Sequence, residues 1–386
     1  MWERTYIYGI ETPYEGDKVK EELVGRILTK ILSWNSQDVA RERPDLLCLA
    51  AFKYDKYQPF FPGMRFFESL ALWLSQFEEV EERIIAYEFV KKNLVYLSDD
   101  EMEHLVTMAY PDYITQVLIE RVSRDIQIPK WCVAKVVKSK EFKISLRQSI
   151  FLGLSDGAHI GLFRRSNPTL SHEQILRTHE INKDRAKRMS DELRSDLTKI
   201  LQHQPDEKTA KFRNVFLLDD FSASGIGYLR KEGPVFKGKL ANFYNVACKD
   251  SGDAYHLFDH SMLSVCLVLY AATEESFQYL SRLGPCLFGD VSFEVKVVCL
   301  LSNSIKLDAK KDEKFIKMLR KYFDNSILTE SYRKGKHEKP HMGFNECGLP
   351  LILSHNTPNN SIPLLWFEPR IRRYRGLFPR VNRHSV

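Results

Sequence analysis

Residues 214–227, NVFLLDDFSASGIG, join an apolar run to two carboxylates and a turn of small residues. The run from Val215 to Leu218 has no polar member, which is typical of a strand buried on both faces of a parallel sheet. Asp219 and Asp220 follow this predicted strand directly. The sequence therefore predicts an acidic pair at the carboxyl edge of an α/β sheet, which is where ligands of such folds bind.

Three further apolar runs are predicted as strands of the same sheet. They are residues 149–154 (SIFLGL), 263–270 (LSVCLVLY) and 291–301 (VSFEVKVVCLL). Helical stretches are predicted between them over 173–202 and 273–283. Alternation of strands and helices favours an α/β fold with a parallel sheet that is covered on both faces.

The amino-terminal part of the chain has a different pattern. Residues 1–140 read as mostly helical, with a long amphipathic stretch over 64–97 and no glycine between Phe66 and Ile150. We therefore expect a helical region over 1–140 for packing or partner binding. Residues 141–386 are expected to form the α/β domain and to end in a basic tail.

Composition excludes several classes of protein. The 386 residues carry 57 Lys and Arg against 51 Asp and Glu, a net charge of +6 that is low for a dedicated nucleic-acid binder. The longest apolar run, 262–272, is far shorter than the roughly 18–20 residues that span a bilayer. The first residues contain no apolar segment typical of a signal peptide. The cysteines form no CxxC pair or zinc-spaced cluster, so no protein-bound metal is predicted. We expect a soluble, cytoplasmic protein with no membrane partner.

The turn after the acidic pair has the chemistry of an anion site. Gly225 and Gly227 let backbone N–H groups approach a phosphoryl group, Ser224 adds a hydroxyl, and a following helix would add its dipole. The carboxylates suit sugar hydroxyls or a phosphate-bound Mg²⁺. One interpretation is a ribose 5-phosphate site, and the other is a tight strand-to-helix turn with a capping aspartate. No Walker lysine follows Gly225, which argues against an NTPase P-loop.

The same stretch resembles the phosphoribosyl-pyrophosphate (PRPP) motif of phosphoribosyltransferases. The resemblance implies that Asp219 and Asp220 grip the ribose hydroxyls during catalysis, with PRPP and Mg²⁺ as the expected ligands. It also implies that the next loop wraps the 5-phosphate. The residues predicted for this loop are Ser222, Ala223, Ser224, Gly225, Ile226 and Gly227. The motif departs from the family pattern at Ala223 and Gly227, where hydroxyl residues are commoner.

In that family a pyrophosphate-binding loop follows the first strand of the sheet. Here the run SIFLGL is followed by a turn of small residues and a predicted helix with two arginines, which would counter the ligand's charge. The residues assigned to this loop are Ser155, Asp156, Gly157, Ala158, His159, Arg164 and Arg165. The alternative is a common SDG turn. Residues 228–259 are predicted to form a lid over the substrate or, alternatively, a surface insertion.

A polar loop near the carboxyl terminus is the third candidate segment. Residues 348–366, GLPLILSHNTPNNSIPLLW, predict a short strand followed by this loop. His355 can move a proton near neutral pH, and asparagine amides both donate and accept hydrogen bonds. We predict catalytic roles for His355 and Asn356, and contact of Asn359 and Asn360 with the ribosyl acceptor. An Asx-rich turn is the alternative.

Together, the three segments after a helical first part resemble the phosphoribosyltransferase-like (PRTase-like) effector proteins of bacterial antiphage and retron-type conflict systems. The resemblance implies a phosphoribosyltransferase-like sheet core and a toxin that performs ribosyl transfer or glycosidic-bond chemistry on PRPP or a ribonucleotide. A retron effector would have a reverse transcriptase and its DNA–RNA product as partners. The arginines expected to contact them are Arg370, Arg372, Arg373, Arg375, Arg380 and Arg383.

Other functions remain open at the level of the sequence. The fold is also compatible with a catalytically inactive nucleotide-sensing regulator or with a nucleic-acid-binding subunit of a defence complex. The arginine-rich end could equally be a solvated terminus or a brace on acidic helix faces. The sequence leaves the acceptor and the oligomeric state undefined.

Overall fold

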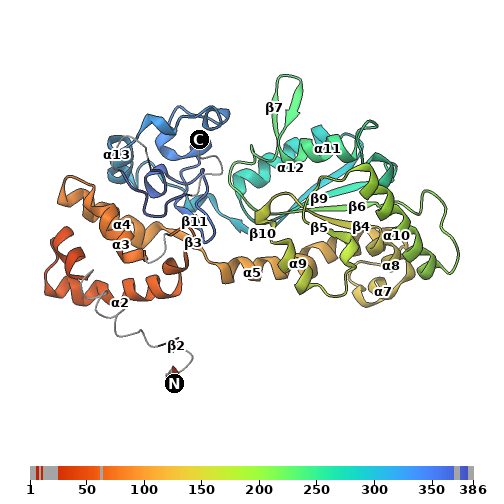
Figure 1. The fold of residues 1–386 in the computed structure, drawn as a ribbon, viewed down its shortest axis with the longest axis horizontal. Helices are drawn as coiled ribbons and strands as arrows, with labels where there is room; N and C mark the ends of the chain where they lie inside the picture. The colour runs from red at the N-terminus through yellow and green to blue at the C-terminus, as the bar shows by residue number, and fades with distance from the viewer. Residues whose placement is uncertain (1–5, 8–9, 12–24, 61–63, 369–373, 381–386) are drawn as a thin grey trace. The chain divides into compact units, whose positions relative to one another are not determined.

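The chain forms two compact units in the computed structural model (Figure 1). The structure describes residues 6–7, 10–11, 25–60, 64–368 and 374–380. Unit 1 comprises residues 1–99 and 304–386, and unit 2 comprises residues 100–303. This division differs from the expected boundary at residue 140, because the helices after residue 100 pack on the sheet and the chain after residue 303 packs on the amino-terminal helices.

Unit 2 is built on a sheet of five parallel strands in the order β10-β9-β6-β4-β5. The strands are β4 (Ser149–Gly153), β5 (Ile175–Leu176), β6 (Asn214–Ser222), β9 (Ser264–Thr273) and β10 (Ser292–Leu301). The α/β prediction and the four predicted strands are confirmed. The expected helix over 173–202 is wrong in its first part, because β5 occupies it and helix α10 (Lys183–Leu201) begins later.

The order of the strands reverses beside β4. The chain passes from β4 to β5 on one side and then returns to β6, β9 and β10 on the other side. In open α/β sheets, loops leave neighbouring strands in opposite directions at such a switch point, and ligands bind in the crevice between those loops. Gly153, the last residue of β4, pairs with Leu218. Asp219 and Asp220 therefore lie just beyond the end of β4.

Helices cover both faces of this sheet, as its continuous apolar strands require. On one face, α10, α11 (Lys239–Ala247) and α12 (Glu274–Phe288) pack in a single apolar cluster with β4, β6 and β9. On the other face, Phe151 stacks on Phe216 with ring centroids 5.4 Å apart and packs against Phe163 of α9. The helices that precede the sheet or cover this second face are α5 (Asp99–Met108), the π-helical turn Ala109–Ile114, α6 (Thr115–Asp125), α7 (Val133–Lys138), α8 (Lys140–Arg147) and α9 (Ile160–Ser166).

A β-hairpin interrupts the region predicted as a lid. Strands β7 (Arg230–Glu232) and β8 (Val235–Lys237) pair in antiparallel fashion between β6 and α11. The hairpin extends away from the sheet in Figure 1. Its lid function stays a prediction.

Unit 1 is mainly helical. Its elements are β1 (Tyr6–Ile7), β2 (Ile10–Glu11), α2 (Ser36–Phe52), α3 (Phe66–Ser75), α4 (Val80–Asn93), β3 (Val95–Leu97), α13 (Glu313–Lys321) and β11 (Leu351–Leu353). The long amphipathic stretch over 64–97 is not one continuous helix. Phe77 turns into the core between α3 and α4, and β3 pairs in parallel with β11, so the chain leaves the helical path twice.

The carboxyl-terminal residues 374–380 lie inside unit 1 rather than on a solvated tail. Leu377 and Phe378 are fully buried. Five aromatic side chains have ring centroids within 6.0 Å of the Phe378 ring, namely Tyr54, Tyr57, Phe60, Phe66 and Tyr96. The segment therefore closes the core of unit 1.

Two arginines of the expected basic tail contact their own unit. The Nε of Arg375 lies 3.7 Å from a carboxylate oxygen of Glu368, and the guanidinium of Arg380 lies 5.5 Å from the ring centre of Trp366. Four others, Arg370, Arg372, Arg373 and Arg383, are outside the described residues. Within the described ranges no helix combines the length and the apolar character needed to cross a bilayer.

Replacing Phe378 by alanine should lower the free energy of unfolding of unit 1 by about 3–5 kcal/mol, because the substitution leaves a cavity among five rings. Urea unfolding followed by tryptophan fluorescence measures this, since Trp34, Trp73 and Trp366 belong to unit 1. Phe52→Ala is the matched control, because Phe52 is 60% exposed. Equal losses for the two variants would contradict the placement of Phe378 in the core.

Candidate functional site

Asp219 is a buried carboxylate with two partners from outside its own strand. Its side chain is 0% exposed. The Ser155 hydroxyl, from the loop after β4, donates to one carboxylate oxygen. The Lys239 ammonium, from the first residue of α11, pairs with the other. One carboxylate thus joins β6, the loop after β4 and the start of α11.

The surroundings of Asp219 are both apolar and charged. Burial raises the pKa of Asp219, the charge of Asp220 raises it further, and the Lys239 ammonium and the Ser155 hydroxyl act in the opposite direction. Lys239 is itself 32% exposed, and its ammonium lies 4.7 Å from the ring centre of Tyr228. Lys239 is therefore the cationic partner of Asp219 inside the unit.

Asp220 has a different environment from its neighbour. It is half-buried, and its Oδ1 accepts a hydrogen bond from the Phe221 N–H at 2.8 Å. Gly157 approaches Asp220 so closely that a Cβ at position 157 would overlap its Oδ2. The predicted pyrophosphate loop and the acidic pair therefore meet. Since Asp219 is enclosed, Asp220 is the carboxylate of the pair that borders solvent.

The predicted phosphate loop is held from the next strand. The Thr273 hydroxyl donates to the Ala223 carbonyl at 2.5 Å, and the Ser276 hydroxyl donates to Ser222 Oγ at 2.6 Å. Gly225 has a φ of +76°, and a Cβ there would lie 2.7 Å from the Tyr279 ring. Helix α12 therefore fixes the loop and requires glycine at position 225.

The backbone of this loop presents N–H groups without internal partners. In the part of the chain that the structure describes, the N–H groups of Gly225, Ile226 and Gly227 donate to no protein acceptor. Ile226 is half-buried and Gly227 is exposed, whereas Ser222, Ala223, Ser224 and Gly225 are buried. Successive unpaired amides of this kind form a concavity that suits an anion.

The expected helix after the phosphate loop is not present. The chain turns at Tyr228 and enters the hairpin β7–β8 instead. The helix start beside the loop belongs to α12, and its first turn carries Glu274 and Glu275. The negative charges of these two carboxylates oppose the positive end of the helix dipole, so the start of α12 does not attract an anion. The backbone amides of the loop are therefore the groups that suit an anionic ligand.

The pyrophosphate loop is only partly as predicted. Ala158 is buried, and its carbonyl accepts a hydrogen bond from the Tyr270 hydroxyl at 2.8 Å. Asp156 is exposed. His159 adopts a left-handed conformation with φ of +46°. The contact of Arg164 and Arg165 with a pyrophosphate group stays a prediction. Both lie in the last turn of α9, away from its beginning at the loop, and Arg164 donates to the Ile175 carbonyl at 2.7 Å.

Four residues at the site were missed by the sequence analysis as members of it: Lys239, Tyr228, Tyr270 and His179. Lys239 lies 20 residues after Asp219, and no spacing rule connects them. His179 follows β5 in a segment that was expected to be helical. Burial lowers the pKa of His179, and the charge of Lys239 lowers it further while Glu180 raises it. His179 therefore lies in partly buried surroundings that favour its neutral form, at the same edge of the sheet.

The third candidate segment, residues 355–360, belongs to unit 1. The Asn356 N–H donates to the Leu353 carbonyl at 3.1 Å, so the loop turns back on β11. The Asn359 carbonyl accepts from the Phe344 N–H at 2.8 Å, and the Asn360 amide donates to the Phe344 carbonyl at 3.1 Å. These hydrogen bonds are typical of a turn that is held against β11 and the segment around Phe344. The catalytic roles of His355 and Asn356 and the acceptor contacts of Asn359 and Asn360 stay predictions.

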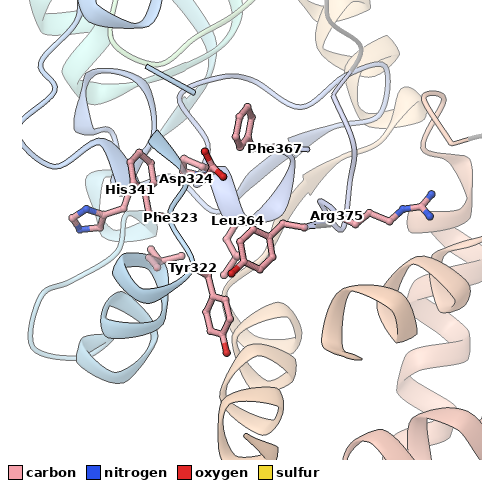
Figure 2. Close-up of a pocket in the computed structure, with 10 residues that line it drawn as sticks. Tyr322, Phe323, Asp324, His341, Leu364, Phe367 and Arg375 are labelled. Atoms are coloured by element: carbon pink, nitrogen blue, oxygen red, sulfur yellow. The ribbon is translucent and has the colours of Figure 1, made fainter. Parts of the chain in front are cut away.

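A pocket of unit 1 involves none of the residues predicted for the ribosyl site, although Arg375 of the predicted basic tail lines it (Figure 2). Tyr322, His341, Leu364 and Arg375 are among its lining residues. Its volume of about 20 Å³ holds roughly one water molecule. The pocket is therefore too small for a nucleotide.

Replacing Lys239 by methionine should destabilise unit 2 by about 3–5 kcal/mol, because the Asp219 carboxylate would stay buried without a counter-ion. The double variant Asp219→Asn with Lys239→Met should recover most of this loss. Thermal unfolding followed by circular dichroism measures both. Lys237→Met is the control, since its ion pair with Glu232 lies on the exposed hairpin. A loss of the same size for Lys237→Met would contradict the role of Lys239.

Comparisons with known proteins agree with the architecture. The model of the family described as PRTase-CE matches residues 70–380, which is more than half of the chain. No curated protein and no solved structure matches the chain. The matched range includes the whole parallel sheet and the acidic pair at its carboxyl edge. The expectation of a phosphoribosyltransferase-like protein is confirmed at this level, and the chain belongs to the PRTase-CE family.

Proposed function

We propose that unit 2 binds PRPP or a ribonucleotide at the switch point of its sheet and acts on the ribosyl group. The observation that carries the proposal is the meeting of two loops there. Gly157 of the first loop lies against Asp220, and the second loop follows Asp220 with the unpaired N–H groups of residues 225–227. A switch point is where parallel α/β sheets bind ligands.

Different groups at this site suit different parts of the ligand. The amides of Gly225, Ile226 and Gly227 suit the 5-phosphate, because oriented N–H groups stabilise an anion without a net positive charge. The half-buried Asp220 suits the ribose hydroxyls, because a carboxylate accepts two hydrogen bonds from a diol. In ribosyl transfer, positive charge develops on the ribose ring, and a nearby carboxylate would stabilise it.

Mg²⁺ would have to arrive with the ligand. Among the described residues, no group of three or more His, Cys, Asp or Glu side chains is arranged to hold a metal ion. Asp219 is committed to Lys239, which leaves Asp220 as the carboxylate that would contact an ion carried by the ligand's phosphates. When bound, Mg²⁺ would neutralise charge on a pyrophosphate leaving group.

A non-catalytic sensor is the second candidate function, and the ion pair of Asp219 favours it. A site in which a lysine offsets one of the two carboxylates can bind a nucleotide, yet it has less net negative charge to stabilise a cationic ribosyl group. Ligand-dependent stabilisation of the protein without any product from PRPP or nucleotides would support this function. Formation of pyrophosphate or a free base would support the enzyme.

We extend the proposal to a toxin-like effector role in antiphage or retron-type defence. This extension rests on the sequence resemblance alone. Induced expression in bacteria is the direct test, and toxicity that is lost in Asp220→Asn is the expected result. A reverse transcriptase and its DNA–RNA product remain proposed partners.

The crevice can be blocked with one methyl group. Gly157→Ala should weaken binding of ribose 5-phosphate by about 10-fold or more, because the added Cβ forces the Asp220 carboxylate to move. Isothermal titration calorimetry with ribose 5-phosphate measures the affinity. Gly161→Ala is the matched control, since a Cβ at position 161 meets no atom within 4 Å. Asp220→Asn should weaken binding as much as Gly157→Ala.

Two results would contradict the proposal. One is unchanged affinity in both Gly157→Ala and Asp220→Asn, with both variants folded by circular dichroism. The other is no measurable binding of ribose 5-phosphate or PRPP to the parent protein at millimolar concentration with Mg²⁺ present.

A further inference from the structure

Trp131 is an exposed aromatic side chain on an otherwise well-packed unit. It is 79% exposed, and no other large hydrophobic side chain among the described residues is as exposed. The turn that carries it leads directly into α7, where Val133 is also 43% exposed. A tryptophan that has lost nearly all packing contributes little to the fold and offers a flat apolar surface to a partner.

Lysines surround Trp131 in the sequence and lie on the surface in the structure. All five lysines between residues 128 and 145 are exposed, whereas Glu141 is the one acidic residue in that range. They are Lys130, Lys135, Lys138, Lys140 and Lys143. We call Trp131 and these lysines the basic–aromatic patch.

Much of the positive charge of the patch is uncompensated. Within the described ranges, Lys135, Lys138 and Lys143 have no carboxylate oxygen within 4.0 Å, whereas Lys130 pairs with Glu120 at 2.7 Å. Lys140 donates to the Leu201 carbonyl at 3.4 Å. Lys135 and Lys138 are three residues apart on α7, so they share one side of that helix. The charge of the patch is complementary to a polyanion.

The backbone beneath the patch is held firmly. Val136 of α7 is fully buried and Phe142 of α8 is almost fully buried. The Ser139 side chain caps α8 by accepting from the Phe142 N–H at 3.1 Å. Helix α8 ends at Arg147 and β4 begins at Ser149, so the patch precedes the amino end of the sheet. The crevice proposed for ribose binding lies at the opposite, carboxyl edge.

We propose that the basic–aromatic patch binds single-stranded nucleic acid. Lysine ammonium groups pair with successive phosphates, and an exposed indole stacks on an unpaired base of any sequence. An intact duplex keeps its bases stacked on one another, so Trp131 has no base to contact there. The patch fits a membrane surface less well, because Val136 of α7 is buried, so Trp131 and Val133 would make only a small apolar anchor.

Binding of a fluorescein-labelled 20-nucleotide oligothymidine to the full chain tests the proposal. Fluorescence anisotropy between 50 and 300 mM NaCl gives the affinity and its salt dependence. The triple variant Lys135→Glu, Lys138→Glu and Lys143→Glu should bind at least about 30-fold more weakly at 100 mM NaCl. Its salt slope should fall by about 2, since each lost phosphate contact removes roughly 0.7.

Trp131→Ala should weaken binding by about 10-fold with little change in salt slope, because it removes stacking and no charge. The control triple variant Lys310→Glu, Lys311→Glu and Lys334→Glu makes the same change of charge at exposed lysines of unit 1. Its affinity should stay within about 3-fold of the parent. Circular dichroism establishes that each variant is folded.

Several outcomes would overturn the proposal. They are equal losses in the patch and control variants, equal affinity for a 20-base-pair duplex, or no binding of the oligonucleotide together with binding to phosphatidylserine vesicles. A loss in Arg370→Ser, Arg372→Ser and Arg373→Ser without a loss in the patch variants would assign binding to the carboxyl-terminal residues instead. None of these measurements depends on ribose 5-phosphate binding.

Discussion

A charged carboxylate inside a protein needs a partner, and for Asp219 that partner is Lys239. The pair, together with the Ser155 hydroxyl, ties three segments of unit 2 at one point. These segments are the end of β6, the loop after β4 and the start of α11. Loss of Lys239 or of Ser155 would leave one oxygen of the buried Asp219 carboxylate without this partner, so the position of the carboxylate depends on both. The exposed hairpin β7–β8 lies between the two ionic partners in sequence and is anchored at both ends by them.

This arrangement separates the two members of the acidic pair into different roles. Asp219 positions the loops, while Asp220 lies at the border of the crevice against Gly157. The phosphate loop is in turn fixed by the first turn of α12 through the Thr273 and Ser276 hydroxyls. The proposed site is therefore framed by β6, α11 and α12, and the groups proposed to contact a ligand are the backbone amides of residues 225–227 and the Asp220 carboxylate.

The sequence predicted those parts of the fold that depend on local patterns. Buried parallel strands are continuous apolar runs, so β4, β6, β9 and β10 could be located, whereas β5 has only two residues and leaves no such run. The amphipathic stretch over 64–97 is interrupted at Phe77 and ends in β3, which pairs with β11, more than 250 residues away. The burial of residues 374–380 likewise depends on contacts that are remote in sequence. No local pattern carries that information.

In the candidate site, too, the features that are local in sequence could be predicted, and the contacts that are remote in sequence could not. The acidic pair and the glycines of both loops could be recognised, because their spacing along the chain is their signal. The ion pair of Lys239 with Asp219 could not, because it depends on where α11 begins after the hairpin. Arg164 and Arg165 were assigned to the pyrophosphate loop from their nearness in sequence. A seven-residue helix places them at its far end.

A crystal structure of the protein with ribose 5-phosphate would show which atoms of unit 2 meet a ribosyl phosphate. The phosphoryl group should lie within hydrogen-bond distance of the N–H groups of Gly225 to Gly227. A ribose hydroxyl should lie on Asp220, with the ion pair of Asp219 and Lys239 intact. A ligand bound elsewhere, or one that displaces Lys239 to reach Asp219, would rule out the proposed site.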